Sequence, residues 1–494
     1  MRSNPGRGLQ PNVLGTFDTV VMAVAGSAPA YSLATTTAVL VGAVGLASPA
    51  ALLYCAIPML GIVFAYGRLG RLDANAGAAY SWVARTLHPF LGFLSGWALV
   101  ISTTIFMVAG SLPAGAMTLA LLDGPDGPLT GDTRLATLVG AGWLLIMVLV
   151  VLGGARITVR AQLLLSGAEM GLLLIFIVVA IAHEGSARPF DWSWLGFAHF
   201  HGASGFASGA LVAAFYYWGW DITSNLSEET RNSRRTAGLA ALIGIGVVFL
   251  LFEAFTIAVN IILSDEQLAA GSANVLGALG EVLWPGIGGK LLIVAVMLST
   301  VATLETTLIQ VTRSLFAMGR DRTLPAAFGK VHRRLNTPWV AITVTGVVGL
   351  GMLAAATAIG SVTEIVADSV TAISLQISVY FGLAGLAAVV AYRKVLLRSL
   401  RDFVFAGLWP LGGALFMFWI FFESLSELSR TAIVIGIGGL AVGLIPMFWY
   451  WRKGSSYYCP AKLDATRIVA DDGAYADTAL GRSERTDEAL STDF

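Results

Sequence analysis

The sequence predicts an all-α integral membrane protein, on three observations. Of its 494 residues 56% are hydrophobic and only 12% are charged, a balance foreign to water-soluble proteins of this size. No Lys, Arg, Asp or Glu occurs between Asp18 and Arg68, which leaves room for two helical spans of about 20 residues each, with a turn at 45–49. The alternating pattern of barrel strands is absent, so each span is expected to be a helix.

Apolar segments of spanning length continue along the chain and predict twelve transmembrane helices. They lie near residues 17–43, 47–67, 90–122, 135–154, 158–182, 206–226, 237–263, 287–318, 338–359, 363–391, 403–422 and 431–451. The flanking regions are polar. Residues 1–13 are predicted to be an N-terminal tail, and residues 454–494 an acid-rich tail that is mostly disordered.

Basic residues are concentrated in alternate loops and predict the orientation. Of 30 Lys and Arg residues, only Arg134, Arg188, Lys290 and Arg430 fall in the other set of loops. The positive-inside rule therefore makes the basic loops and both termini cytoplasmic, in a multi-pass protein of the cytoplasmic (inner) membrane. The zero net charge gives no reason to expect nucleic acid as a partner, whereas membrane lipid is an expected one.

Two predicted spans contain an interruption. In the first, Gly26, Ser27 and Ala28 precede Pro29, whose missing N–H weakens the helix. In the sixth, the run FYYWGWD at 215–221 holds a glycine among aromatic residues and ends in a carboxylate. Helix N-termini at such breaks attract a carboxylate, while free carbonyls and an acid attract an ammonium group. An amino acid carries both groups.

The first and sixth positions correspond in a five-plus-five inverted repeat. The first repeat would comprise helices 1 to 5 at residues 14–182, and the second would comprise helices 6 to 10 at residues 206–391. Helices 11 and 12 would follow at residues 403–451. This arrangement is typical of secondary transporters with a site at the membrane midplane.

With these motifs the chain resembles the amino acid, polyamine and organocation superfamily of permeases, from residue 15 to about residue 451. Further matches are the segment SEETRNSRRT at 227–236 and the segment TRSLFAMGRD at 312–321. The resemblance implies a leucine-transporter-type fold with interrupted helices 1 and 6. It also implies a secondary active transporter that moves an amino acid by alternating access, as a cation- or proton-coupled carrier or an exchanger. A polyamine or other organic amine permease is the alternative.

The resemblance also implies a substrate site. Gly26, Ser27 and Ala28 would offer backbone groups to a carboxylate, and Tyr31 would line the same site. Phe215 would be an aromatic lid, and Trp218 and Gly219 would flank the turn that holds the amine. For each aromatic residue, packing between helices is the competing interpretation.

Four acids fall inside predicted spans: Glu169, Asp221, Glu253 and Glu305. An acid facing lipid costs about 2.5 kcal/mol or more, so these residues should face a cavity or be neutral and hydrogen-bonded between helices. Asp221 and Glu305 are candidates for both substrate binding and coupling, and together would favour a cationic amino acid or a diamine. For Glu253 the structural interpretation is preferred.

Glu169 is predicted to be a titrating or cation-binding group for a coupling proton or sodium ion. Many proton-coupled relatives in the superfamily carry a Lys in the fifth helix, and this span has none, while Glu169 stands near that position.

Other function classes lack support in the sequence. There is no P-loop, no H-E-x-x-H motif, no nucleophile with a base and no metal-ligand cluster, so neither an enzyme, a cofactor nor a metal is expected. A channel or a receptor remains as a less favoured alternative, and a channel would differ by its fast, non-saturable flux.

Overall fold

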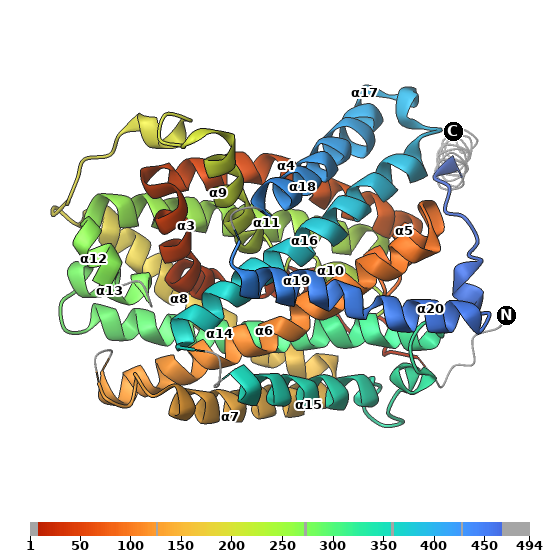
Figure 1. The fold of residues 1–494 in the computed structure, drawn as a ribbon, viewed down its shortest axis with the longest axis horizontal. Helices are drawn as coiled ribbons and strands as arrows, with labels where there is room; N and C mark the ends of the chain where they lie inside the picture. Colours follow the sequence, from red (N-terminus) through yellow and green to blue (C-terminus); the bar gives the residue numbers. More distant parts are fainter. Residues whose placement is uncertain (1–7, 125–126, 271–273, 357–359, 426–427, 467–494) are drawn as a thin grey trace, which may run out of the picture.

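The computed structural model describes residues 8–124, 127–270, 274–356, 360–425 and 428–466, and every regular element in these ranges is a helix (Figure 1). Ten helical stretches are long and apolar enough to cross a membrane, so the chain is a multi-pass membrane protein. One stretch, Thr16–Leu72, contains the first two predicted spans, and the sixth predicted span is represented by the shorter apolar helix Gly202–Tyr216. The count of twelve spans and the inverted repeat stay predictions.

The helices fall into three groups along the chain. The first half contains α1 (Thr16–Gly26), α2 (Pro29–Tyr31), α3 (Thr37–Val44), α4 (Ser48–Leu72), α5 (Ala79–Thr86), α6 (Pro89–Asp123), α7 (Thr133–Leu152) and α8 (Ala155–Ala182). The second half contains α9 (Gly202–Tyr216), α10 (Ile222–Asn225), α11 (Ser233–Ile262), α12 (Asp265–Ala270), α13 (Val275–Leu283), α14 (Gly288–Arg320), α15 (Trp339–Ala356) and α16 (Val362–Tyr392). The C-terminal part contains α17 (Leu400–Asp402), α18 (Trp409–Ser424), α19 (Arg430–Val442) and α20 (Leu444–Arg452).

Shorter helical turns join these elements. The π-helical turns are η1 (Ser32–Thr36) and η6 (Phe403–Leu408). The 3-10 turns are η2 (Gly45–Ala47), η3 (Trp192–Leu195), η4 (Ala326–Gly329), η5 (Leu396–Arg398) and η7 (Ser456–Tyr458). The η1 turn continues α2 into α3, so the part of the first predicted span that follows its break is one continuous helical rod.

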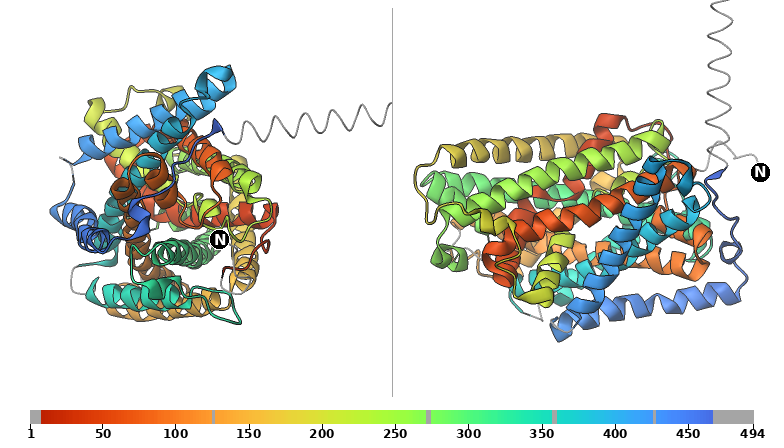
Figure 2. Two further views of the ribbon diagram at one scale, coloured as in Figure 1. Left: turned by 90° about the vertical axis from the view of Figure 1, so that its right-hand side faces the viewer. Right: turned by 90° about the horizontal axis from the view of Figure 1, so that it is seen from above.

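Three long helices form the middle of the molecule. α6, α14 and α16 are the most deeply buried of the spanning helices, and α6 contacts both of the others. They cross the centre of Figure 1, with α7 and α15 side by side on one face. In the end-on view on the left of Figure 2, the other helices surround this centre. The interrupted helices α1, α2, α9 and α10 lie inside the bundle, against α14, α11 and α16.

The two ends of the bundle differ in charge. The end with α5, α17 and the last turn of α20 carries the arginine-rich connections predicted to be cytoplasmic, and is called the basic end from here on (Figure 1). α3, α12 and α13 lie at the opposite end. Which end faces the cytoplasm stays a prediction.

Residues 454–466, the first part of the predicted disordered tail, pack onto the basic end. The ring of Tyr457 stacks on that of Tyr80 with centroids 4.6 Å apart, and its hydroxyl donates to the Tyr80 carbonyl at 3.1 Å. Lys394 Nζ lies 2.6 Å from Asp464 Oδ2, and this hydrogen bond is the main reason that the pKa of Asp464 is lowered to about 2. The remaining residues of that tail, 467–494, lie outside the described part of the chain.

A buried ion pair joins two of the sequence motifs at the basic end. Arg313 donates from Nε and Nη2 to the two carboxylate oxygens of Glu229 at 2.9 and 3.0 Å, and both side chains are at most 1% exposed. The backbone N–H groups of Val13 and Leu14 donate to the Glu229 carbonyl at 2.8 and 3.1 Å. The chain before α1, the segment after α10 and the last part of α14 are thereby held together.

Removing one member of this pair should destabilise the fold strongly. We expect Glu229→Ala to cost about 3–5 kcal/mol, because it leaves the Arg313 charge buried without a partner. The matched control is Asp464→Ala, which removes the partner of the solvent-exposed Lys394 and should cost no more than about 1 kcal/mol. The melting temperatures of both variants in detergent would check this, and equal shifts would contradict it.

Candidate functional site

The break in the first predicted span lies at Ser27 and Ala28, where the sequence places it. α1 ends at Gly26, Ala28 has a φ of 50° in the left-handed region, and α2 starts at Pro29. Pro29 has no N–H to donate into α1, which weakens the helix at this point, although α4 and α6 continue through Pro58 and Pro113. Ser27 N and Ala28 N form only turn hydrogen bonds, to Val24 O and Ala25 O, both at 3.1 Å.

The break in the sixth predicted span extends over residues 217–221. α9 ends at Tyr216 and α10 starts at Ile222. Gly219 between them has a φ of +99°, a conformation that residues with a side chain rarely adopt. The aromatic, glycine and acid pattern of the sequence therefore marks the unwound turn.

The two breaks touch each other through their glycines. A Cβ added to Gly219 would overlap the carbonyl oxygen of Gly26, and a Cβ added to Gly26 would overlap the carbonyl oxygen of Gly219. Such an approach is possible only between residues without side chains. The two unwound turns thus form one polar backbone region in the interior of the bundle.

A closed circuit of four aromatic rings lies beside these breaks. Tyr31 of α2 packs against Phe106 of α6 and Phe215 of α9, with centroids 5.7 and 6.5 Å apart. Trp218 completes the circuit, at 5.8 Å from Phe106 and 6.0 Å from Phe215. All four side chains are buried, and the Tyr31 hydroxyl donates to Ala109 O at 2.8 Å. Aromatic faces attract cations, so this ring circuit suits an ammonium group.

Asp221 ends the second break with one carboxylate oxygen bound and the other free. Its Oδ2 accepts from Gln310 Nε2 of α14 at 2.9 Å and from the Tyr380 hydroxyl of α16 at 3.3 Å. Its Oδ1 is buried and has no hydrogen-bond partner among the described residues. Glu253 and Glu305 also have buried carboxylate oxygens without a partner among the described residues, so what distinguishes Asp221 is its position at the second break.

Glu169 of α8 lies at the start of α2. Its Oε1 accepts from the backbone N–H of Ala30 at 2.9 Å, while Ser299 Oγ of α14 accepts from Tyr31 N at 3.2 Å. Because Pro29 has no N–H, these contacts satisfy the free donors of the first turn of α2. The carboxylate of Glu169 thus occupies the helix N-terminus to which a substrate carboxylate would be attracted.

Glu305 lies on a different face of α14 from the residues that meet the breaks. Ser299 and Thr303 face α1 and α2, where Thr303 Oγ1 donates to Ala25 O at 3.0 Å. At about 100° per residue, Glu305 is roughly 160° around the helix from Thr303. With the Gln162 amide oriented so that both its atoms have partners, Gln162 of α8 donates to Glu305 Oε2 at 2.7 Å. Glu305 and Asp221 therefore have different neighbours.

Several residues of the site carry no signal in the sequence. Phe106, Ser299, Gln310 and Tyr380 lie in long apolar helices without a distinguishing motif, and only the packing of α6, α14 and α16 brings them to the breaks. Among the described residues no group of three or more His, Cys, Asp or Glu could hold a metal ion.

Interrupted helices that meet inside an all-helical membrane bundle, next to buried acids and aromatic rings, define a carrier for small solutes. The chain belongs to the amino acid permease family, because the sequence model of that family, described as "Amino acid permease", matches residues 14–451. The predicted membership of the amino acid, polyamine and organocation superfamily is thereby confirmed. Its members are transporters and not enzymes.

Characterised relatives match most of the chain. The methylthioribose transporter of Bacillus subtilis (strain 168) is 29% identical over 405 residues, which cover 79% of this chain and 83% of the relative. The low-affinity putrescine importer PlaP of Escherichia coli (strain K12) is 26% identical, covering 80% and 84%. The branched-chain amino acid permease BcaP of Bacillus subtilis (strain 168) is 24% identical, covering 81% and 84%. These relatives carry different kinds of solute.

Proposed function

We propose that this permease is a secondary active transporter that moves an amino acid across the cytoplasmic membrane by alternating access. The observation that carries the proposal is the meeting of the two broken helices beside the four-ring circuit and the free oxygen of Asp221. The substrate ammonium group would bind between Asp221 and the rings of Phe215 and Trp218. Backbone groups of residues 26–28 and 219 would complete the site, and Tyr31 would close its outer side.

The proposed transport cycle is supported by contacts at the two ends of the bundle. At the basic end, the Glu229–Arg313 pair and the backbone bonds of Val13 and Leu14 join the chain before α1 to the segment after α10 and to α14. At the opposite end, a pocket of about 240 Å³ lies between η1, α6 and α16 and is lined by Thr35, Pro113 and Val366 among others. Rocking of the broken helices against the rest of the bundle would open the two ends in turn. In this proposal the chain spans the membrane twelve times, and both termini lie on the cytoplasmic side.

An organic amine without a carboxylate is the second candidate substrate, and one observation favours it. Glu169 and Ser299 already bind the amides of Ala30 and Tyr31, so a substrate carboxylate would have to displace them. An amine needs only the acid and the rings. The putrescine importer among the relatives agrees with this candidate, and the branched-chain amino acid permease agrees with the first.

Uptake into liposomes by the purified protein tests the function. Saturable uptake of a labelled substrate, inhibited by alanine, arginine or putrescine, would support a carrier for an amino-bearing solute. Inhibition by alanine and arginine but not by putrescine would select the amino acid, and the reverse would select the amine. Non-saturable flux would contradict a carrier, and inhibition by methylthioribose alone would contradict recognition of an ammonium group.

We further propose that Glu169 couples transport to a proton or a sodium ion. Glu169→Gln keeps an oxygen that can accept from the Ala30 amide but removes the charge, so binding should persist while coupling is lost. We expect gradient-driven accumulation to fall at least about fivefold, because typical coupling free energies begin at about 1 kcal/mol, which corresponds to that factor. Equilibrium exchange should be retained. Glu305, also buried, is proposed as a second titrating group at the α8–α14 interface.

The matched control for this experiment is Glu184→Gln, which neutralises an exposed acid in the loop after α8. Accumulation should be measured under an imposed proton gradient and, separately, under a sodium gradient. If either gradient still drives the Glu169→Gln variant as well as the control, or if neither drives the unmodified protein, the coupling role of Glu169 is refuted.

A further inference from the structure

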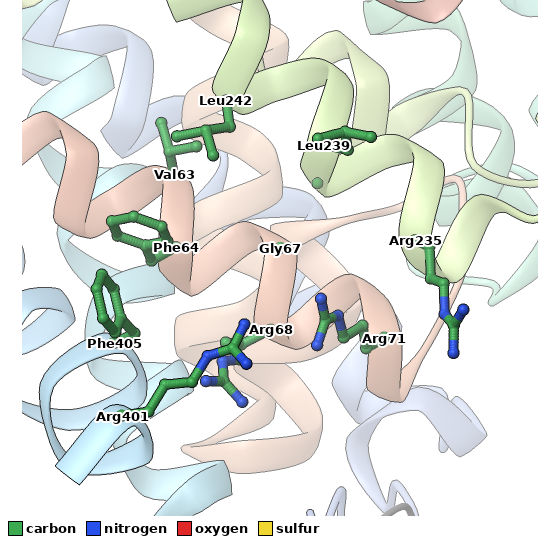
Figure 3. A pocket seen from close by; sticks show the side chains of 11 residues that line it. Val63, Phe64, Gly67, Arg68, Arg71, Arg235, Leu239, Leu242, Arg401 and Phe405 are labelled. Atoms are coloured by element: carbon green, nitrogen blue, oxygen red, sulfur yellow. The ribbon is translucent and has the colours of Figure 1, made fainter. Parts of the chain in front are cut away.

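An arginine-lined pocket opens at the basic end, away from the proposed substrate site. It has a volume of about 470 Å³ and lies between α4, α11 and the segment formed by α17 and η6 (Figure 3). Four of its lining residues are arginines: Arg68 and Arg71 of α4, Arg235 of α11 and Arg401 of α17. The remaining lining residues are apolar or glycine.

The positive charge of this pocket is only partly neutralised. Arg68 pairs with Asp402 at 2.9 Å, and its guanidinium lies over the Tyr392 ring at 5.6 Å. Arg71, Arg235 and Arg401 have no ion pair within the described part of the chain. Three like charges around one hollow repel each other, and a bound anion would relieve that repulsion. Guanidinium groups suit phosphate in particular, because they can bind two of its oxygens at once.

Two glycines bring the arginines of separate helices together. A Cβ on Gly238 of α11 would lie 2.8 Å from the Cα of Gly67 of α4, so the two backbones are in direct contact there. This crossing places Arg68 and Arg71 beside the start of α11. Arg235 lies in the first turn of α11, the positive end of a 30-residue helix, where an anion is favoured and a basic residue is not. A ligand anion accounts for this placement, whereas helix stability does not.

The apolar part of the pocket lies toward the middle of the bundle. Phe64 precedes Arg68 by one turn of α4, and Leu239 and Leu242 follow Arg235 by one and two turns of α11. Figure 3 shows these apolar side chains and Phe405 on one side, with the guanidinium groups of Arg68, Arg71 and Arg401 near one another on the other side. Charge at the helix ends and apolar surface one or two turns inward is the order of a phospholipid, headgroup outside and acyl chains inside.

We propose that this pocket is a binding site for an anionic phospholipid. Its phosphate lies among Arg71, Arg235 and Arg401, and its acyl chains follow Phe64, Leu239, Leu242 and Phe405. The lipid joins α4, α11 and α17 at the basic end, and so stabilises the permease independently of substrate. Orientation in the membrane needs only exposed basic loops. It does not require arginines of three helices around one pocket, or an apolar surface next to them.

Thermal stability in detergent tests this site. We expect phosphatidylglycerol to raise the melting temperature of the full chain by several degrees, and phosphatidylcholine to raise it much less. The double variant Arg71→Gln, Arg235→Gln should lose most of the phosphatidylglycerol effect. Its matched control is Arg156→Gln, Arg160→Gln, which removes two exposed charges from the first turns of α8 and should keep the full effect.

Two outcomes would overturn the proposal. An equal shift with phosphatidylglycerol in both double variants would mean that the lipid binds elsewhere. A shift of the same size with inorganic phosphate or glycerol phosphate would mean that the pocket takes a soluble anion and not a lipid. Native mass spectrometry of the two double variants would provide a second readout, with one fewer retained phosphatidylglycerol expected for the pocket variant.

Discussion

Replacement of Gly219 by alanine is expected to abolish transport while leaving a protein that still inserts and can be purified. Gly219 has a φ of +99°, and holding a residue with a Cβ there costs on the order of 1–3 kcal/mol. The new Cβ would also overlap the carbonyl oxygen of Gly26, so the two breaks would have to separate. Because the proposed site is formed where the breaks meet, a small displacement should remove substrate binding altogether.

The measurement is substrate uptake into liposomes, normalised to the amount of folded protein in the membrane. The matched control is Gly142→Ala in α7, where an added Cβ would meet no atom within 4 Å. That change should preserve uptake, and it should stabilise α7 by about 0.5–1 kcal/mol because alanine is the better helix residue. Uptake by Gly219→Ala equal to that of Gly142→Ala would show that contact between the two breaks is not needed for transport.

The positions of the breaks could be predicted because local chemistry determines them. Pro29 cannot donate a hydrogen bond, and Gly219 reaches a positive φ without strain. Each indicates a break only together with its neighbours, the small residues 26–28 and the aromatic run that ends at Asp221, because α4 and α6 continue through Pro58 and Pro113. The contact between Gly26 and Gly219 could not be predicted from composition, since it joins residues far apart in the chain. It depends on how α1 and α9 lie against α14 and α16, which only the packing of all four helices determines.

The partners of the buried acids show the same limit. A sequence gives the angle between Glu305 and Thr303 around α14, but not which face of α14 meets the first span. The structure places Thr303 against Ala25 and turns Glu305 toward Gln162 of α8. Likewise, the sequence identifies Glu169 as a buried acid, but it does not predict the contact of Glu169 with the Ala30 amide. That prediction would need the positions of α8 and α2 relative to each other along the helix axes.

The basic loops illustrate how a general interpretation of a sequence can hide a specific feature. Arg68, Arg71 and Arg235 are consistent with orientation of the chain in the membrane, and the sequence offers no reason to group them. Their convergence follows from the crossing of α4 and α11 at Gly67 and Gly238, which the absence of two side chains permits. Small residues at a helix crossing are common in membranes, so such a pair is a signal worth searching for in related chains.

Neutralising Asp221 is expected to weaken binding of amino-bearing substrates without disturbing the fold. In Asp221→Asn the side-chain oxygen can still accept from Gln310 Nε2 and the Tyr380 hydroxyl, and no helix cap is lost because the Asp221 side chain makes no capping hydrogen bond to α10. The charge that would meet the substrate ammonium is lost. A hydrogen bond to a charged group contributes about 1.5–3 kcal/mol, so the KM should rise roughly 10- to 100-fold.

Glu253→Gln is the matched control for this change, because Glu253 is an acid within α11 whose two carboxylate oxygens are buried and have no hydrogen-bond partner among the described residues. It should leave the KM unchanged, since Glu253 is not part of the proposed site. The KM of both variants should be measured for alanine, arginine and putrescine. A rise of the KM for all three substrates in Asp221→Asn alone would show that Asp221 recognises their ammonium group. An unchanged KM would instead assign Asp221 to helix packing and leave the four aromatic rings as the cation-attracting part of the proposed site.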